Sequence, residues 1–120
     1  MMKMRPAALG LWLAFMGVCI SASPSQAAER AGELFVELCS VCHGAAGKGD
    51  GPTAAGLNPR PADFTNCQVM EAHPEETLFT IIKRGGQSVG RSAMMPAWGE
   101  ALNDGQIRAL VAVVRGFCKK

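Results

Sequence analysis

The chain has 120 residues, which is room for one small domain, and 48% of them are hydrophobic, so a highly charged disordered chain is excluded. Its formal net charge of +2 comes from Lys3 and Arg5, because the 12 basic residues less these two leave 10, against 10 acidic residues. From residue 28 onward the chain is formally neutral. Charge therefore gives no reason to expect nucleic acid or an anionic membrane as a partner.

The first 27 residues have the pattern of a secretory signal. A short basic stretch precedes an almost wholly apolar run over residues 9–20, and the Ser-Gln-Ala of residues 25–27 places small residues where a signal peptidase reads the chain. The alternative is a retained membrane anchor, but the apolar run is shorter than the roughly 20 residues that a spanning helix needs. We expect cleavage after Ala27, which leaves a periplasmic domain of residues 28–120.

Apolar residues at helical spacing predict an amphipathic helix over residues 29–41, with Glu29, Glu33 and Glu37 on its exposed face. A second helix is expected to begin at the His-Pro-Glu-Glu of residues 73–76, where proline suits the first helical position, and to stop at the glycine pair of residues 85–86.

The last predicted helix begins at Asn103, since Gln106 lies three residues further on in a capping-box arrangement. The stretches between the helices, residues 44–61 and 87–101, are expected to be long loops, because they lack periodicity and the first is rich in Gly and Pro. No segment alternates as a strand does. The predicted fold class is all-α, a single domain with two long loops.

Cys39, Cys42 and His43 form the pattern C-x-x-C-H, which is typical of covalent haem attachment. Two thiols three positions apart at a helix end can each add to a vinyl group of the haem, and the adjacent imidazole can then bond the iron. A thioredoxin-like pair would be expected beside a strand, and zinc needs four ligands at matching spacing. Cys67 and Cys118 form no second close pair, so the sequence predicts one covalently bound haem c per chain.

The second axial position on the iron has several candidates. They are Met70, His73, Met94 and Met95. His73 precedes a proline at a helix start, where a solvated or capping role is commoner than ligation, and Met70 could simply pack in the core. Pro96 restricts Met95 to an extended backbone that suits a loop across a haem face, whereas Met94 would point the other way. We expect Met95 to be the distal ligand opposite His43.

Three segments, CSVCHGAAGKGDGP, LNPRPADF and MPAWGEALNDGQIRALVAVVR, resemble class I cytochromes c. The nearest branch is the bacterial one, whose members are small periplasmic carriers or haem subunits and domains of larger respiratory complexes. The resemblance spans nearly all of the chain after the leader. It implies a cytochrome c fold, with three to four helices wrapped round one haem.

The resemblance carries two further expectations about contacts. The first and last helices should cross beside the haem, and here the crossing would involve Gly32, Phe35, Leu110 and Val114. A loop proline carbonyl should accept a hydrogen bond from His43, and the candidates are Pro52, Pro59 and Pro61.

The resemblance does not require Cys67 or Cys118. In an oxidising compartment these two cysteines would most simply pair, and their separation of 51 residues would make the bond worth roughly 2–4 kcal/mol. Two free or intermolecular thiols are the alternative, because geometry decides which form occurs.

A haem with histidine and methionine ligands has no vacant site for a substrate, so the expected function is single-electron transport and not enzymatic catalysis. The expected partners are a redox donor and an acceptor, with Lys48, Lys83, Arg84 and Arg91 as cations that could surround the exposed haem edge. Two alternatives remain open. One is an electron-entry subunit of a larger oxidoreductase, and the other is a haem peroxidase or gas sensor without the methionine ligand.

Overall fold

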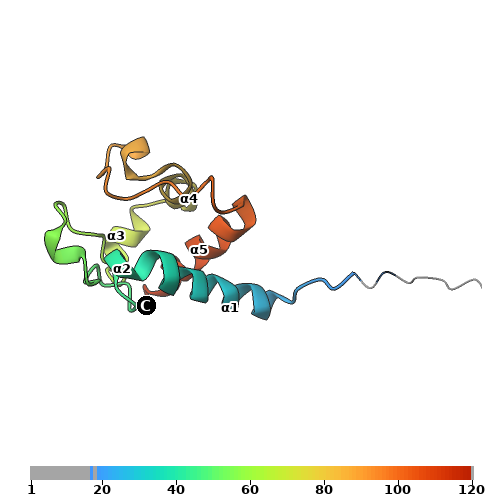
Figure 1. Cartoon of the computed structure of the whole chain (residues 1–120). Helices are drawn as coiled ribbons and strands as arrows, with labels where there is room; N and C mark the ends of the chain where they lie inside the picture. Colours follow the sequence, from blue (N-terminus) through green and yellow to red (C-terminus); the bar gives the residue numbers. More distant parts are fainter. Residues whose placement is uncertain (1–16, 18, 120) are drawn as a thin grey trace, which may run out of the picture.

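The computed structural model describes residue 17 and residues 19–119, and no residue of this part lies in a β-strand. The helices are, in chain order, α1 (Pro24–Leu34), α2 (Ser40–His43), α3 (Cys67–Glu71), α4 (Glu75–Arg84) and α5 (Asp104–Gly116). Shorter helical turns are η1 (Phe35–Cys39), η2 (Ala54–Gly56) and η3 (Gly86–Val89). The helices gather into one body with two long loops, which confirms the all-α prediction (Figure 1).

Helix α1 begins five residues before the expected start at residue 29. Ser23 is its N-cap and exchanges hydrogen bonds with Gln26 in a capping box, and Pro24 occupies the first turn. The prediction followed the periodicity of the buried face, which begins only after Ser23 and Gln26, so it placed the start too late. The predicted cleavage position after Ala27 therefore lies within the first turns of α1, whereas most of the predicted secretory signal, residues 1–16 and 18, lies outside the described residues.

A π-helical turn, η1, joins α1 to α2 without a break in the helical path (Figure 1). The Ser40 hydroxyl donates a hydrogen bond to the Val36 carbonyl within this turn. A π turn holds one more residue than an α turn, so it rotates the residues after it relative to those before it. As a result, Ala31 and Phe35 point into the core while Cys39, four residues later, faces the cavity described below.

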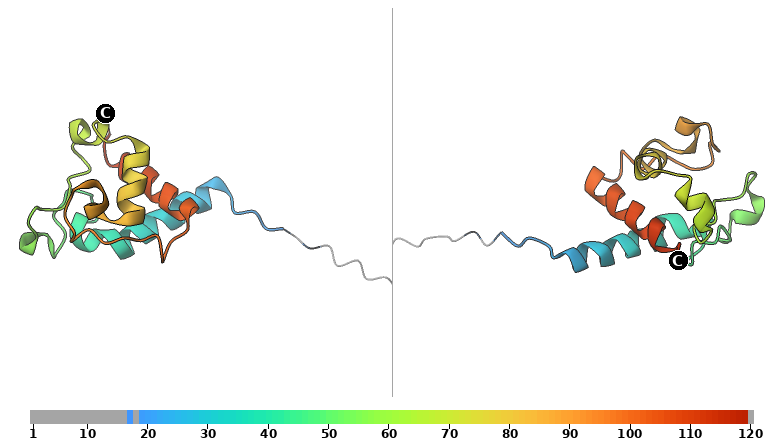
Figure 2. Two further views of the ribbon diagram at one scale, coloured as in Figure 1. Left: turned by 90° about the horizontal axis from the view of Figure 1, so that it is seen from above. Right: turned by 180° about the vertical axis from the view of Figure 1, so that it is seen from behind.

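Helix α5 crosses α1, and both views of Figure 2 show the two helices in contact. The predicted Asn103 cap is confirmed, since its side chain and that of Gln106 form a reciprocal capping box. The expectation that Gly32 lies in the crossing is wrong, because a Cβ added there would meet no atom within 4 Å. Ala31, the preceding residue, is the buried small residue on this face.

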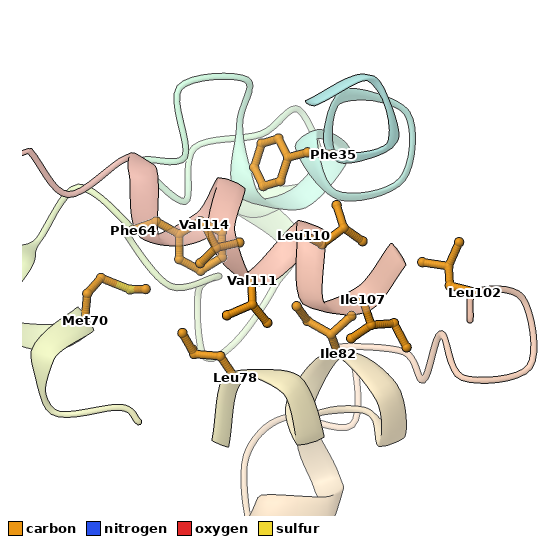
Figure 3. Packing of buried hydrophobic residues seen from close by; sticks show 10 residues of the cluster. All are labelled: Phe35, Phe64, Met70, Leu78, Ile82, Leu102, Ile107, Leu110, Val111 and Val114. Carbon is orange, nitrogen blue, oxygen red and sulfur yellow. The ribbon is translucent and has the colours of Figure 1, made fainter. Parts of the chain in front are cut away.

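The core draws on η1, α3, α4, α5 and the loops between them. Its cluster of buried apolar residues is drawn in Figure 3 and comprises Phe35, Phe64, Met70, Leu78, Ile82, Leu102, Ile107, Leu110, Val111 and Val114. The expected contact of Phe35 with Leu110 and Val114 falls within it. Ile107 and Leu110 are completely buried, so α5 is the central element against which α1 and α4 pack.

Helix α4 ends as predicted at Gly85, which adopts a positive φ of 83°. Pro74 is its N-cap and not its first helical residue, so α4 begins at Glu75, one residue later than expected. Two ion pairs, Lys83 with Asp104 and Arg108 with Glu76, join α4 to α5 on the surface.

The sequence did not predict α3, a single turn capped by the Asn66 side chain. Its first residue, Cys67, forms a disulfide with Cys118 after α5, with the two Cα atoms 5.0 Å apart. Arg115 adds a second link, since its guanidinium donates hydrogen bonds to the carbonyls of Met70 and His73. The intramolecular pairing is thus the alternative that occurs, and it fixes the connection between α3 and α4 to the end of α5.

Among the described residues, no helix has the length and apolar character needed to cross a membrane.

Candidate functional site

A cavity of about 660 Å³ lies between the segment around α2 and the two long loops. Its lining is mostly apolar and comes from η1, α2, α3, α4, α5 and both loops. Cys39, Cys42, His43 and Met95 all line it, so residues predicted from two distant segments meet in one space. The volume is within the range of about 300–1,000 Å³ that small-molecule and cofactor sites occupy.

The backbone after His43 folds back on α2 and holds the C-x-x-C-H turn. The amide of Gly49 donates to the carbonyl of His43 over 2.8 Å, and that of Gly51 donates to Cys42 over 3.0 Å. These bonds satisfy carbonyls that the end of a helix would otherwise leave unpaired. Gly51 must be glycine for this approach, because a Cβ there would lie 2.5 Å from the carbonyl oxygens of Ser40 and Val41.

The His43 ring is held from two sides. Its Nδ1 lies 3.2 Å from the Ala62 carbonyl oxygen, and its ring stacks on Phe64 with centroids 4.4 Å apart. The expected acceptor was a proline carbonyl, but the loop after α2 places the carbonyl of Ala62, the residue after Pro61, beside the ring instead. Burial lowers the pKa of His43, and the Ala62 hydrogen bond opposes that shift; the net lowering favours the neutral ring that a metal-binding imidazole requires.

The two thiols of the motif lie in different surroundings. The pKa of the Cys39 thiol is raised to about 11, mainly by burial and to a smaller extent by the neighbouring Cys42. The Cys42 Sγ lies 3.2 Å from the Thr53 hydroxyl, which itself donates to the Val41 carbonyl. The disulfide between Cys67 and Cys118 removes these two sulfurs from any shared zinc site.

Met95 is held in position by the turn that follows α4. Its carbonyl accepts a hydrogen bond from the buried Gly86 amide over 3.0 Å, and its amide donates to the Ser92 carbonyl. Further along, the amides of Trp98 and Gly99 donate to the carbonyls of Ile82 and Lys83. The loop is therefore anchored along the end of α4, and the Met95 side chain packs against the core.

The other candidates for the distal position also line the cavity, in different environments. Met94 is 62% exposed, whereas Met70 is 3% exposed and belongs to the core cluster. Both ring nitrogens of His73 have partners: Nδ1 lies 2.7 Å from the Val69 carbonyl, and Nε2 contacts a guanidinium nitrogen of Arg91. An imidazole with both nitrogens occupied has none left for iron.

The four cations expected near the haem edge are not equivalent. Lys83 is paired with Asp104 on α5, and only Arg91 of the four lines the cavity. Arg60 also lines it and was missed, because it lies between two prolines in a loop that carried no pattern.

The residues present fit a covalently attached haem. Two thiols and an imidazole occupy one segment, a thioether approaches from another, and the remaining lining is largely apolar. This donor set suits a soft iron centre with sulfur and nitrogen ligands within a hydrophobic shell.

Residues 26–113 match the family model of cytochrome c oxidase, cbb3-type, subunit III. The chain belongs to this family. Members of the cytochrome c family bind haem c covalently, so the chain is a haem-binding electron-transfer domain. It is 30% identical over 88 residues to the FixP subunit of the cbb3-type cytochrome c oxidase of Azorhizobium caulinodans, covering 73% of this chain and 26% of FixP. It is 28% identical over 91 residues to the CcoP subunit of Azospirillum brasilense, covering 76% of this chain and 28% of CcoP. The cbb3-type domain thus spans about a quarter of the length of these relatives.

Solved structures agree with this cbb3-type assignment. The KustC0563 c-type cytochrome is similar with a TM-score of 0.62 and 29% identity, over 74% of this chain and 98% of that one. A chain of the reducing HAO-like protein complex Kustc0457/Kustc0458 of Kuenenia stuttgartiensis has a TM-score of 0.61 over 75% of this chain and 42% of its own length. Its identity of 23% supports the shared fold alone. The chain is therefore a cytochrome c domain by fold as well as by sequence.

Proposed function

We propose that the chain is a periplasmic single-electron carrier, not an enzyme, with one haem c bound through Cys39 and Cys42 and ligated by His43 and Met95. The observation that carries the proposal is that these four residues, from two distant segments, line one largely apolar cavity. When bound, haem supplies a one-electron Fe(III)/Fe(II) couple.

The chain's own residues support that couple by positioning. Ala62 and Phe64 orient the His43 ring, so that Nδ1 is occupied and Nε2 is the nitrogen left for the metal. Gly86 and Ser92 fix the backbone on either side of the Met95 side chain. A site held from both sides changes little between oxidation states, which favours rapid electron transfer.

Exposed apolar side chains rim the cavity and favour brief contacts with redox partners. Val41, Val69 and Met94 are each more than a third exposed and all line the cavity. A donor or acceptor could approach over this rim, and small, weak interfaces are usual for electron-transfer encounters.

Maturation and mass measurement test the proposal. The protein should be expressed with haem c maturation factors, and its mass should equal residues 28–120 plus one haem that survives denaturation. The ferric spectrum should show the weak far-red band of methionine ligation. Haem that acidified organic solvent extracts would refute covalent attachment, and a mass that includes residues 1–27 would refute removal of the leader.

A second candidate function is an electron-entry subunit of a larger oxidoreductase. The curated relatives are named as subunits of cbb3-type oxidases and are about four times as long as the aligned segment. Co-purification with a partner at high salt from the native membrane or periplasm would favour the subunit, and a monomer in both fractions would favour the free carrier. A haem peroxidase or gas sensor would instead lack the far-red band and bind exogenous ligands at the iron.

A further inference from the structure

The charges that line the cavity are of one sign. Arg60 and Arg91 are the two residues in the lining with a permanent charge, and no Asp or Glu is among the lining residues. An apolar cavity that holds two guanidinium groups suits a ligand that is mostly hydrophobic and carries two negative charges. Haem has this character, because two carboxylates project from the edge opposite its two vinyl groups.

Of the two arginines, Arg91 is the one that the fold holds in place. Its amide donates to the Gly86 carbonyl over 2.8 Å, which fixes the backbone directly after Gly90. Its side chain reaches from this loop to the His73 ring at the turn between α3 and α4. The two ion pairs among the described residues are Lys83 with Asp104 and Arg108 with Glu76, and neither includes Arg91.

His73 is arranged to receive Arg91. Because its Nδ1 faces the Val69 carbonyl, that nitrogen carries the proton and Nε2 is left as the acceptor for the guanidinium. The backbone of His73 is fixed as well, since its carbonyl accepts a hydrogen bond from Arg115 of α5. A chain of contacts from α5 through His73 to Arg91 thus places a charged group at the cavity.

We infer that Arg91, positioned by His73, binds a carboxylate of the haem. The guanidinium has five donors, of which the contact with His73 uses one, so enough remain for a paired contact with a carboxylate. His73 is a positioning residue that acts through Arg91, which accounts for an imidazole that lines the cavity without being free to ligate the metal. The inference rests on the proposed function, since it needs haem to be bound.

The first test compares reduction potentials of the mature haem protein in three forms: wild type, Arg91→Gln and Arg84→Gln. Arg84 is exposed at the end of α4 and does not line the cavity, so its substitution removes the same charge from outside the cavity. A cation beside the haem carboxylates favours the reduced iron. We expect Arg91→Gln to lower the ratio of reduced to oxidised protein at a fixed potential about tenfold, which is 59 mV for a one-electron couple, and Arg84→Gln to lower it less than threefold. Equal shifts would overturn the inference.

A second test examines His73 and detects the carboxylate itself. His73→Leu should reproduce part of the Arg91→Gln shift, and His73→Gln should restore the wild-type value because an amide oxygen can accept from Arg91. His73→Gln should then be compared with the His73→Gln/Arg91→Gln double variant, neither of which has the imidazole. Loss of the guanidinium should raise the pKa of the haem carboxylate. The pH range over which the reduction potential changes with pH should therefore lie higher in the double variant than in His73→Gln.

The two ideas fail separately. A mature protein without covalent haem would refute the proposed function and this inference together. If the wild type carries covalent haem but Arg91→Gln has the same reduction potential and pH profile as the wild type, the inference alone is refuted. Circular dichroism and haem content, measured for every variant, identify any shift that arises from misfolding.

Discussion

Gly47 and Phe117 meet where the loop after the C-x-x-C-H motif lies against the C-terminal segment. A Cβ on Gly47 would lie 2.8 Å from the Phe117 ring, and Gly47 has a positive φ of 71°. Phe117 packs in turn on Phe35 with ring centroids 4.9 Å apart, and the Gly47 carbonyl accepts the Phe64 amide over 2.7 Å. One glycine therefore lets the loop after His43, the turn η1 and the end of α5 share a single aromatic cluster.

Gly47→Ala should destabilise the haem protein by about 1–3 kcal/mol, because the new methyl group collides with Phe117 and the left-handed backbone strains a side chain. Denaturant unfolding of the wild type and the variant measures the difference. An unchanged midpoint would mean that Phe117 moves aside and that the cluster is not tightly packed.

Gly32→Ala should have the opposite effect and raise the unfolding free energy. A Cβ there meets no atom within 4 Å, and alanine in a helix interior is favoured over glycine by roughly 0.5–1 kcal/mol. The variant serves as a matched control for Gly47→Ala in the same unfolding experiment. Destabilisation would show that Gly32 does lie in the crossing of α1 and α5.

Met95→Leu should remove the proposed distal ligand while costing less than about 1.5 kcal/mol of packing, since leucine preserves the side-chain volume. The reduction potential should fall and the far-red ferric band should vanish. Met94→Leu is the matched control and should keep both, because Met94 is 62% exposed. The reverse pattern would make Met94 the ligand, and an effect of neither would direct attention to Met70.

His43→Ala should prevent stable folding as well as redox function. The substitution removes the proposed proximal ligand together with the stacking on Phe64 and the contact with Ala62, and metal binding of this kind contributes directly to folding. Helicity by circular dichroism and haem content per chain are the measurements. A His43→Ala protein with native helicity and full haem content would contradict the assignment, and His73→Ala, which changes the other histidine of the chain, should retain both.

Replacement of both Cys67 and Cys118 by serine should lower the unfolding free energy by roughly 2–4 kcal/mol, because the disulfide closes a 51-residue separation. The haem spectrum should be unchanged, since neither cysteine lines the cavity. Unfolding in denaturant with and without a thiol reductant tests the wild type in the same way. Equal stability under both conditions would show that the bond does not restrain the chain.

Much of the candidate site could be predicted because its signals are local. Cys39, Cys42 and His43 stand within five residues, and their spacing alone predicts haem attachment. The cap of α5 was likewise predictable, since Asn103 and Gln106 satisfy backbone groups only a few residues away. The start of α1 was not found, although the Ser23 and Gln26 signal was equally local, because the buried face was used to define that helix.

Contacts between distant segments depended on the tertiary structure. The sequence could not choose between a disulfide and free thiols at Cys67 and Cys118, because only packing of α3 against the end of α5 brings their Cα atoms to 5.0 Å. The acceptor for His43 proved to be the Ala62 carbonyl, because any residue can offer a backbone oxygen and the path of the loop decides which one arrives. The pairing of His73 with Arg91 has the same origin. The sequence offers them separately, as a ligand candidate and as a cation near the haem edge, and they meet because α5 holds the turn that carries His73 through Arg115.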